Sequence, residues 1–233
     1  MFKNKTILVW FIVLLILIID QTSKIWVKTH MGLGEEIPIL GWEKGFIKFI
    51  ENPGMAFGME FGGDWGKLAL SLFRIAAVGF LIYYIRLLIK SKVATSGIII
   101  GFALILAGAL GNILDSAFYG IIFSETPFHG GTATLFPEEG GYASFLHGRV
   151  VDMLYFPMFT GQYPSWLARF PDWFPLKAGE SYLFFSPIFN VADSAITIGV
   201  LSLLLFNRSF FKDEEPVQTP SVVEDEPLLE ELS

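Results

Sequence analysis

Four long apolar segments constrain the fold of this chain more than any other feature of its sequence. They cover about residues 7–27, 67–89, 96–114 and 189–206. About 20 largely apolar residues suffice for a helix to cross the hydrocarbon core of a bilayer. Only 17% of the 233 residues are charged, whereas soluble domains carry about 25%. The sequence therefore predicts a mainly α-helical integral membrane protein, built as a four-transmembrane-helix bundle.

Basic residues near the ends of these segments predict how the chain crosses the membrane. Short flanking stretches on one side carry Lys3, Lys5, Arg86, Lys90, Lys92, Arg208 and Lys212. The other side receives two long connections, about residues 28–66 and 115–188. Since short cytoplasmic loops are enriched in Lys and Arg, we expect both termini in the cytoplasm. No small-residue cleavage site follows the first apolar segment, so we interpret it as an uncleaved anchor.

The parts outside the apolar segments differ in composition. Residues 37–42 and 46–50 have the pattern of short strands, which favours a small sheet at the membrane surface. The stretch from Tyr155 to Pro175 is rich in aromatic residues, as is typical of the headgroup level. Residues 212–233 hold one lysine and eight acidic residues, which accounts for the whole net charge of −7. We expect one folded membrane domain, residues 1–211, followed by a disordered acidic tail, residues 212–233.

Composition also excludes several classes of function. The chain has no cysteine, so thiol catalysis, thiolate metal sites and disulfides are excluded. No apolar segment contains a histidine, and no His/Glu set has the spacing of a zinc site. The neutral body and the acidic tail give no support for nucleic-acid binding. We expect neither a metal nor a cofactor.

Charged residues at or near the outer ends of the apolar segments are the candidates for function. They are Asp20, Lys24, Arg74, Asp115, Asp152 and Asp193. Asp20 and Lys24 are four residues apart and share a helix face. They form either a structural ion pair, with Lys24 extending outward to the interface, or a contact to substrate. Arg74 is either an interfacial anchor or a ligand contact.

Asparagine and aspartate recur three residues apart at two helix ends. Asn112 and Asp115 close the third apolar segment, and Asn190 and Asp193 open the fourth. Taken singly, each aspartate has another interpretation, as a helix cap or as the partner of a nearby arginine. With Asp152, however, three carboxylates and two amides are expected at one bilayer depth, which indicates a common site.

Two aspartates are sufficient for peptide hydrolysis without a metal. Two carboxyl groups about 3 Å apart do not both ionise, so one keeps its proton. The ionised carboxylate activates water while the protonated one donates to the carbonyl oxygen. Spacing alone does not select two of the three candidates Asp115, Asp152 and Asp193.

Two other classes of protein remain open at this point. A small transporter or channel would use intramembrane carboxylates as proton relays or cation ligands, but would spread polar residues through the bilayer depth. A membrane assembly factor would use Gly-rich helix faces and aromatic loops to bind partners, but it leaves the clustered aspartates without a purpose.

Five ordered blocks of the sequence resemble a known family. The blocks are Asp20-x-x-x-Lys24, Asn52-Pro53-Gly54-Met55-Ala56-Phe57-Gly58, Gly111-Asn112-x-x-Asp115, Val150-Val151-Asp152 and Phe189-Asn190-x-Ala192-Asp193. Together they resemble bacterial lipoprotein signal peptidase (signal peptidase II), an aspartyl protease, over about Ile7 to Phe206. The resemblance implies four transmembrane helices, cytoplasmic termini and a small periplasmic β-sheet after the first helix.

The resemblance also implies roles for individual residues. Asp152 and Asp193 are implied as the catalytic pair. Positions implied to support the site or to bind substrate or inhibitor are Asp20, Lys24, Asn52, Gly54, Ala56, Asn112, Asp115, Asn190 and Ala192. The implied reaction removes the signal peptide of a prolipoprotein by cleaving before its diacylglyceryl-modified cysteine, and the implied inhibitor is globomycin. We expect a monomer among the lipids of the bacterial inner (cytoplasmic) membrane, with its active site near the periplasmic face.

Two features depart from the family pattern. Ser116 follows the Asn-x-x-Asp block, where the family usually has arginine. We hypothesise that Arg149, three residues before Asp152, supplies the guanidinium instead. The second connection is also longer than usual, with insertions at Tyr119–Phe145 and Met158–Phe184. We expect these insertions either to pack over the site as a lid or to extend along the membrane surface.

Overall fold

The computed structural model describes residues 2–53, 63–91, 94–171, 177–184 and 187–206. Its long helices are α1 (Phe2–His30), α2 (Gly63–Lys90), α3 (Ser96–Leu114) and α5 (Val191–Phe206). Within the described residues, α1, α2 and the helix that begins with α3 are long and apolar enough to cross a membrane, whereas α5 is a shorter apolar helix. The helix at residues 96–114 has its predicted bounds, and the first helix is longer than predicted at both ends.

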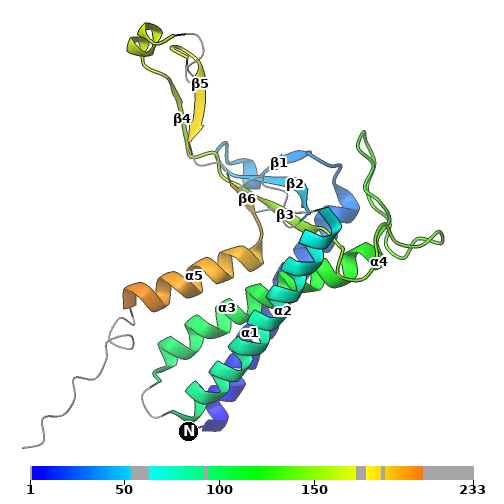
Figure 1. The fold of residues 1–233 in the computed structure, drawn as a ribbon, viewed down its shortest axis with the longest axis vertical. Coiled ribbons are helices and arrows are strands. Elements are labelled where there is room, and N and C mark those ends of the chain that lie inside the picture. Colours follow the sequence, from blue (N-terminus) through cyan, green and yellow to red (C-terminus); the bar gives the residue numbers. More distant parts are fainter. Residues whose placement is uncertain (1, 54–62, 92–93, 172–176, 185–186, 207–233) are drawn as a thin grey trace, which may run out of the picture.

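Helix α3 packs against α1, α2 and α5 (Figure 1). Its own start is capped by Thr95, whose side chain accepts a hydrogen bond from the Ile98 amide. The crossing of α3 and α5 depends on small residues, because a Cβ atom at Gly108 would lie 2.1 Å from the carbonyl oxygen of Ala192. This close approach brings the first turn of α5 beside the last turns of α3.

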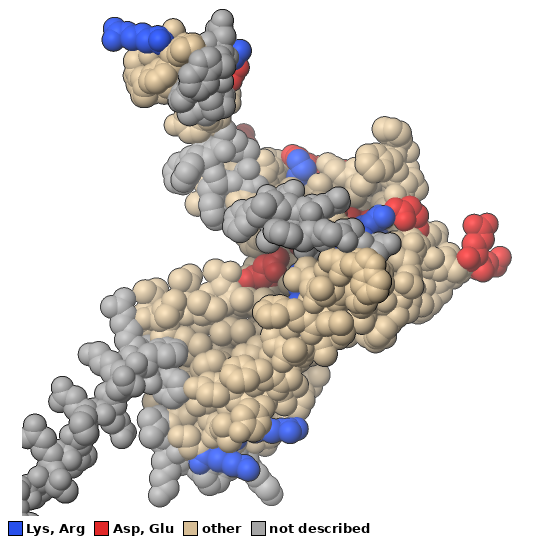
Figure 2. All heavy atoms as spheres, viewed as in Figure 1, with Lys and Arg blue, Asp and Glu red and all other residues tan. Residues whose placement is uncertain are grey.

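The outward faces of the helices are apolar. Large exposed side chains include Phe11, Phe73, Phe80 and Leu204, and the flank of the helices in Figure 2 is mostly uncharged. Such a surface is stable in lipid rather than in water. The protein is therefore a multi-pass membrane protein.

A four-stranded antiparallel sheet lies at one end of the helices (Figure 1). Its order is β1 (Glu36–Pro38), β2 (Phe46–Asn52), β3 (Val150–Tyr155) and β6 (Ile188–Phe189). The predicted small sheet is confirmed, with two corrections. Residues 39–41 form a 3₁₀ turn rather than a strand, with Leu40 at a φ of 50°. Strands β3 and β6 come from the second long connection, where the local pattern predicted none.

The sheet packs on a second apolar core at the ends of α1 and α3. Phe49 of β2 and Val151 and Met153 of β3 belong to one buried apolar cluster with Tyr119 and Phe123, among others. These side chains are fully or almost fully buried. The core thereby fixes β3, which carries Asp152, against the end of α3.

The second long connection contains both predicted insertions. The first begins as helix, because α3 continues through a π-helical segment (Asp115–Tyr119) into α4 (Gly120–Ile122). Its remainder is tied to helix ends, since the Ala133 amide donates to the Lys28 carbonyl at 3.2 Å. The second insertion contains a hairpin of β4 (Phe159–Gln162) and β5 (Ser181–Phe184), with a 3₁₀ helix (Ser165–Arg169) between them. This hairpin projects away from the helices and the larger sheet (Figure 1).

Candidate active site

Asp152 on β3 and Asp193 in the first turn of α5 converge on Asn190. The Asn190 side-chain nitrogen donates to Asp152 Oδ1 at 2.8 Å, and its backbone N–H donates to Asp193 Oδ2 at 3.3 Å. One buried residue therefore hydrogen-bonds both carboxyl groups, although they are 41 positions apart in the chain, at residues 152 and 193.

The start of α5 explains how Asp193 is held. The backbone N–H of Asp193 donates to Asn190 Oδ1 at 2.9 Å, which with the return bond to Asp193 Oδ2 makes a reciprocal capping box. The second oxygen, Asp193 Oδ1, accepts from the side-chain nitrogen of Asn112 at 2.8 Å. Asp193 is thus a helix-capping residue, as one interpretation of the sequence predicted.

Asp152 is almost completely buried, at 5% exposure. Asn52, at the end of β2, donates to its Oδ2 at 3.1 Å. Burial, followed by the negative charge of Asp193, raises the pKa of Asp152 from 3.8 to about 7, although the bonds from Asn52 and Asn190 oppose the shift. A carboxyl group that is half protonated near neutral pH is suited to general acid catalysis.

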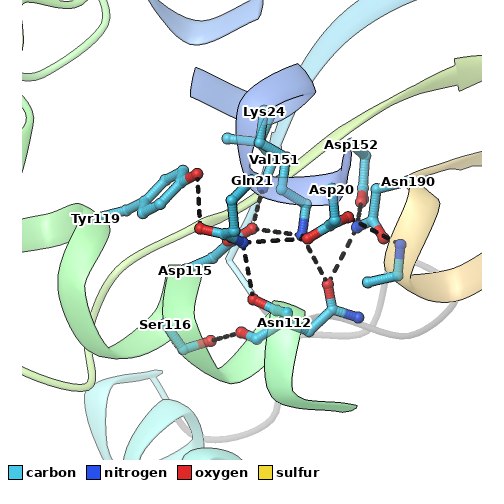
Figure 3. Close-up of polar contacts among 12 residues, drawn as sticks. Asp20, Gln21, Lys24, Asn112, Asp115, Ser116, Tyr119, Val151, Asp152 and Asn190 are labelled. Carbon is cyan, nitrogen blue, oxygen red and sulfur yellow. Dashed lines mark hydrogen bonds and ion pairs between the residues drawn. The ribbon is translucent and has the colours of Figure 1, made fainter. Parts of the chain in front are cut away.

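Lys24 is the centre of a buried ionic cluster behind this pair (Figure 3). Its Nζ lies 2.9 Å from Asp20 Oδ2, 2.9 Å from Asp115 Oδ2 and 3.1 Å from Asn112 Oδ1. Lys24, Asp20 and Asp115 are each 0% exposed. The predicted structural ion pair of Asp20 and Lys24 is confirmed. The expected extension of Lys24 outward to the interface is wrong, because its charge is bound inside the protein.

Each carboxylate of the cluster also holds a backbone segment. Asp115 Oδ2 accepts from the Val151 amide at 3.2 Å, and Asp20 Oδ1 accepts from the Ala192 amide at 2.8 Å. Val151 and Ala192 are the residues that immediately precede Asp152 and Asp193. The ionic cluster thus fixes β3 and α5 at the positions from which the carboxyl pair extends.

Gln21 and Tyr119 also belong to the cluster, and the sequence interpretation missed both. Gln21 Nε2 donates to Asp115 Oδ1 at 2.9 Å and to Asp20 Oδ2 at 3.1 Å, and the Tyr119 hydroxyl donates to Gln21 Oε1 at 3.2 Å. A second polar residue next to Asp20 in an apolar segment was the available signal for Gln21.

Some predicted site residues cannot be placed in this arrangement. Gly54 and Ala56 lie outside the described residues, as do Lys92, Arg208 and the acidic tail. Among the residues that are described, no group of three or more His, Asp or Glu side chains is arranged to hold a metal ion.

The sequence blocks that build this site match an established family over most of the chain. The family model described as signal peptidase (SPase) II matches residues 12–210. The chain belongs to the signal peptidase II family. It is 50% identical over 194 residues to a lipoprotein signal peptidase of Porphyromonas gingivalis, covering 83% of this chain and 80% of that protein. A lipoprotein signal peptidase of Amoebophilus asiaticus is 38% identical over 224 residues, covering 94% and 85% of the two chains.

Solved structures show the same fold. A structure titled as a bacterial membrane enzyme at 1.9 Å resolution superposes with a TM-score of 0.52 at 22% identity, covering 88% of this chain and 94% of the other. A second structure of a bacterial membrane enzyme, at 2.3 Å resolution, also has a TM-score of 0.52 and covers 89% of this chain. At this identity the likeness concerns the fold alone.

The chain departs from the signal peptidase II pattern at Ser116, and the structure places two arginines in relation to it. Arg149 donates to Glu51 at 2.8 Å and to Glu125 at 2.6 Å, in a cluster on the sheet side. The guanidinium that contacts Ser116 is that of Arg74, whose Nη1 donates to Ser116 Oγ at 3.3 Å. The hypothesis that Arg149 takes the missing position therefore receives no support from its described contacts.

Proposed function

We propose that this protein is an aspartic endopeptidase that removes signal peptides from bacterial prolipoproteins, cleaving before the diacylglyceryl-modified cysteine. Membership of the signal peptidase II family and the two named relatives support the reaction. The observation that carries the assignment of the catalytic pair is the contact of Asn190 with both Asp152 and Asp193. The reaction is hydrolysis of a peptide bond by a water molecule held between two carboxyl groups.

The proposed roles follow from the environments of the two carboxyl groups. Asp152 is the more buried, and its raised pKa makes it the group that holds the proton and donates it to the carbonyl oxygen. Asp193 accepts hydrogen bonds from Asn112 and from the Asn190 amide, which orient its carboxyl group. Ionised Asp193 takes a proton from the attacking water. Asp20, Lys24, Asn112, Asp115, Asn190 and Ala192 support this pair, and Asn52 orients Asp152.

The two ends of the bundle support a proposed placement in the membrane. Lys5 donates to the Ala94 carbonyl at 2.8 Å, so the starts of α1 and α3 lie at one end, and the sheet and the carboxyl pair lie at the other. We place the basic end in the cytoplasm. Helix α5 then acts as a fourth span, both termini are cytoplasmic, and the active site lies near the periplasmic face of the inner membrane.

The remaining elements of the proposal concern partners and organisation. The enzyme acts as a monomer on diacylglyceryl-modified prolipoproteins among membrane lipids, and globomycin inhibits it by occupying the same site. Gly54 and Ala56 contribute to that contact, residues 1–211 form the protease domain, and residues 212–233 form a cytoplasmic tail. No cofactor takes part.

Cleavage of a diacylglyceryl-modified prolipoprotein by purified protein tests the proposal. We expect wild type to release the signal peptide and Asp152→Asn and Asp193→Asn to lose cleavage while binding globomycin measurably. Removing only one member of a unit that acts together should abolish most of the rate. Normal cleavage by either variant would refute the pair, and loss of wild-type activity in EDTA would refute the metal-free mechanism.

A further inference from the structure

We propose that Arg74 is a positioning residue that supplies positive charge to the carboxyl pair from helix α2. The inference rests on the proposed function and goes beyond it. Ser116 stands where the family usually has arginine, and its hydroxyl group carries no charge. We assign the supply of that charge to Arg74 of α2, which contacts Ser116.

The direction of the Arg74 side chain is the first support. Ser71 and Val78, one turn before and one turn after Arg74, are 5% and 8% exposed. Residues three and four positions apart share a helix face, so Arg74 faces the bundle. Leu72 and Phe73, on the outer face, are 52% and 71% exposed. An arginine that served only as an interfacial anchor would extend from the outer face.

A chain of hydrogen bonds is the second support. Arg74 Nη1 donates to Ser116 Oγ at 3.3 Å, and Ser116 Oγ donates to the Asn112 carbonyl at 3.0 Å. The side chain of Asn112 donates in turn to Asp193 Oδ1 at 2.8 Å. Arg74 is therefore linked to Asp193 through Ser116 and Asn112, and its positive charge is attracted by the carboxyl groups of both Asp193 and Asp152.

The balance of charge at the site is the third support. Asp20 and Asp115 share the single cation Lys24, so the buried cluster already has an excess of negative charge before the carboxyl pair is added. Among the described residues, the nearby cations Lys28 and Arg149 are bound to Glu51. Within the part of the chain that the structure describes, Arg74 is the nearby cation that remains to balance the ionised member of the pair.

Loss of this charge has a defined consequence. The active pair carries one proton, and a nearby cation makes it easier to remove the other. Without Arg74 the pair keeps both protons to higher pH, so the acid limb of the pH–activity profile moves upward. A purely structural role for Arg74 would lower activity or stability without moving the profile.

The test measures kcat and KM against pH for cleavage of a diacylglyceryl-modified prolipoprotein by the full chain. We expect Arg74→Gln to move the acid limb upward by about one pH unit or more, with kcat below the optimum falling about tenfold per unit and KM changing less. Arg74→Lys should keep the wild-type profile with a lower kcat. Adding Ser116→Arg to Arg74→Gln should return the profile toward wild type, since the charge is restored from the neighbouring position.

Arg86→Gln is the matched control, because Arg86 is an exposed arginine on the same helix, far from the pair. It should retain the wild-type profile. If wild type cleaves and both aspartates are essential, a folded Arg74→Gln protein with an unchanged pH–activity profile would overturn the inference. If wild type does not cleave the prolipoprotein, the proposed function itself would be overturned. If Arg74→Gln does not fold, the Arg74→Gln/Ser116→Arg variant tests the inference instead. A folded double variant whose pH–activity profile is shifted from that of wild type also overturns the inference.

Discussion

Replacing Asp152 by asparagine should stabilise the protein relative to wild type increasingly as the pH rises. The folded state holds the Asp152 proton more tightly than the unfolded chain does, because burial and the charge of Asp193 raise its pKa. Stabilisation from that proton is therefore complete below about pH 3.8 and is lost as the pH rises to about 7. Asparagine has no such proton to lose, so removing the carboxyl group should abolish activity and gain stability at the same position.

The magnitude follows from the shift. A change from 3.8 to about 7, at about 1.4 kcal/mol per pKa unit, corresponds to about 4 kcal/mol over the whole titration. Between pH 5 and pH 8 roughly two of those units are lost, so the stability difference should widen by about 3 kcal/mol. The variant also mispairs one hydrogen bond with Asn52 or Asn190. That effect does not depend on pH and cancels when the two pH values are compared.

Unfolding of wild type and Asp152→Asn in the same micelles, followed by the fluorescence of the six tryptophans, measures this difference. The control repeats the comparison in an Asp193→Asn background. Removal of the neighbouring charge lowers the pKa of Asp152 there, so the widening should be smaller. A stability difference that is equal at both pH values, or that narrows as the pH rises, would refute the reasoning.

Two further predictions concern the supports of the site. Lys24→Met leaves the buried carboxylates of Asp20 and Asp115 without their cation, so we expect a loss of about 3–5 kcal/mol in the free energy of unfolding, measured by denaturation in micelles. Changing both aspartates to asparagine in that variant should restore most of it, and a Lys24→Met protein as stable as wild type would contradict the prediction. Replacing residues 157–186 by Asn-Gly joins Phe156 directly to Pro187. We expect this shortened chain to keep cleavage and the unfolding temperature, because β3 ends and β6 begins next to these two residues and Asn-Gly closes two-residue hairpins. Loss of cleavage in the shortened chain would show that the projecting hairpin serves the site.

The helices and the candidate residues could be predicted from the sequence because both signals are local. Length and apolar composition predict α3. A charged residue within or beside an apolar segment, such as Asp20 or Asp193, is recognised as a candidate from its neighbours in the sequence alone. The i,i+3 spacing of Asn190 and Asp193 likewise predicts a shared helix end, where the structure has a capping box.

The parts that the sequence did not predict depend on contacts between distant residues. Strand β3 pairs with β2 across about a hundred positions, with Asp152 opposite Ile50, and no local pattern specifies that partner. The contact of Arg74 with Ser116 is of the same kind. Proximity in sequence suggested that Arg149 replaces the family arginine missing at Ser116, but its guanidinium binds Glu51 of β2 instead. Spacing along the chain predicts which side chains share a face of one element. Only the packing of elements determines that Arg74, and not Arg149, lies next to Ser116.

The buried cluster of Lys24, Asp20 and Asp115 is better explained by geometry than by stability. A buried ion pair rarely stabilises a fold more than apolar side chains of the same volume would, because both charges lose their hydration. Apolar side chains, however, could not accept hydrogen bonds from the amides of Val151 and Ala192, the residues that immediately precede the two aspartates of the proposed pair. Since Lys24 binds both carboxylates at 2.9 Å, it ties the two amides to one point and so fixes the separation of β3 and α5. Two aspartates that must share one proton need that separation held closely, which is a sufficient physical reason to bury three charges at the end of a membrane helix bundle.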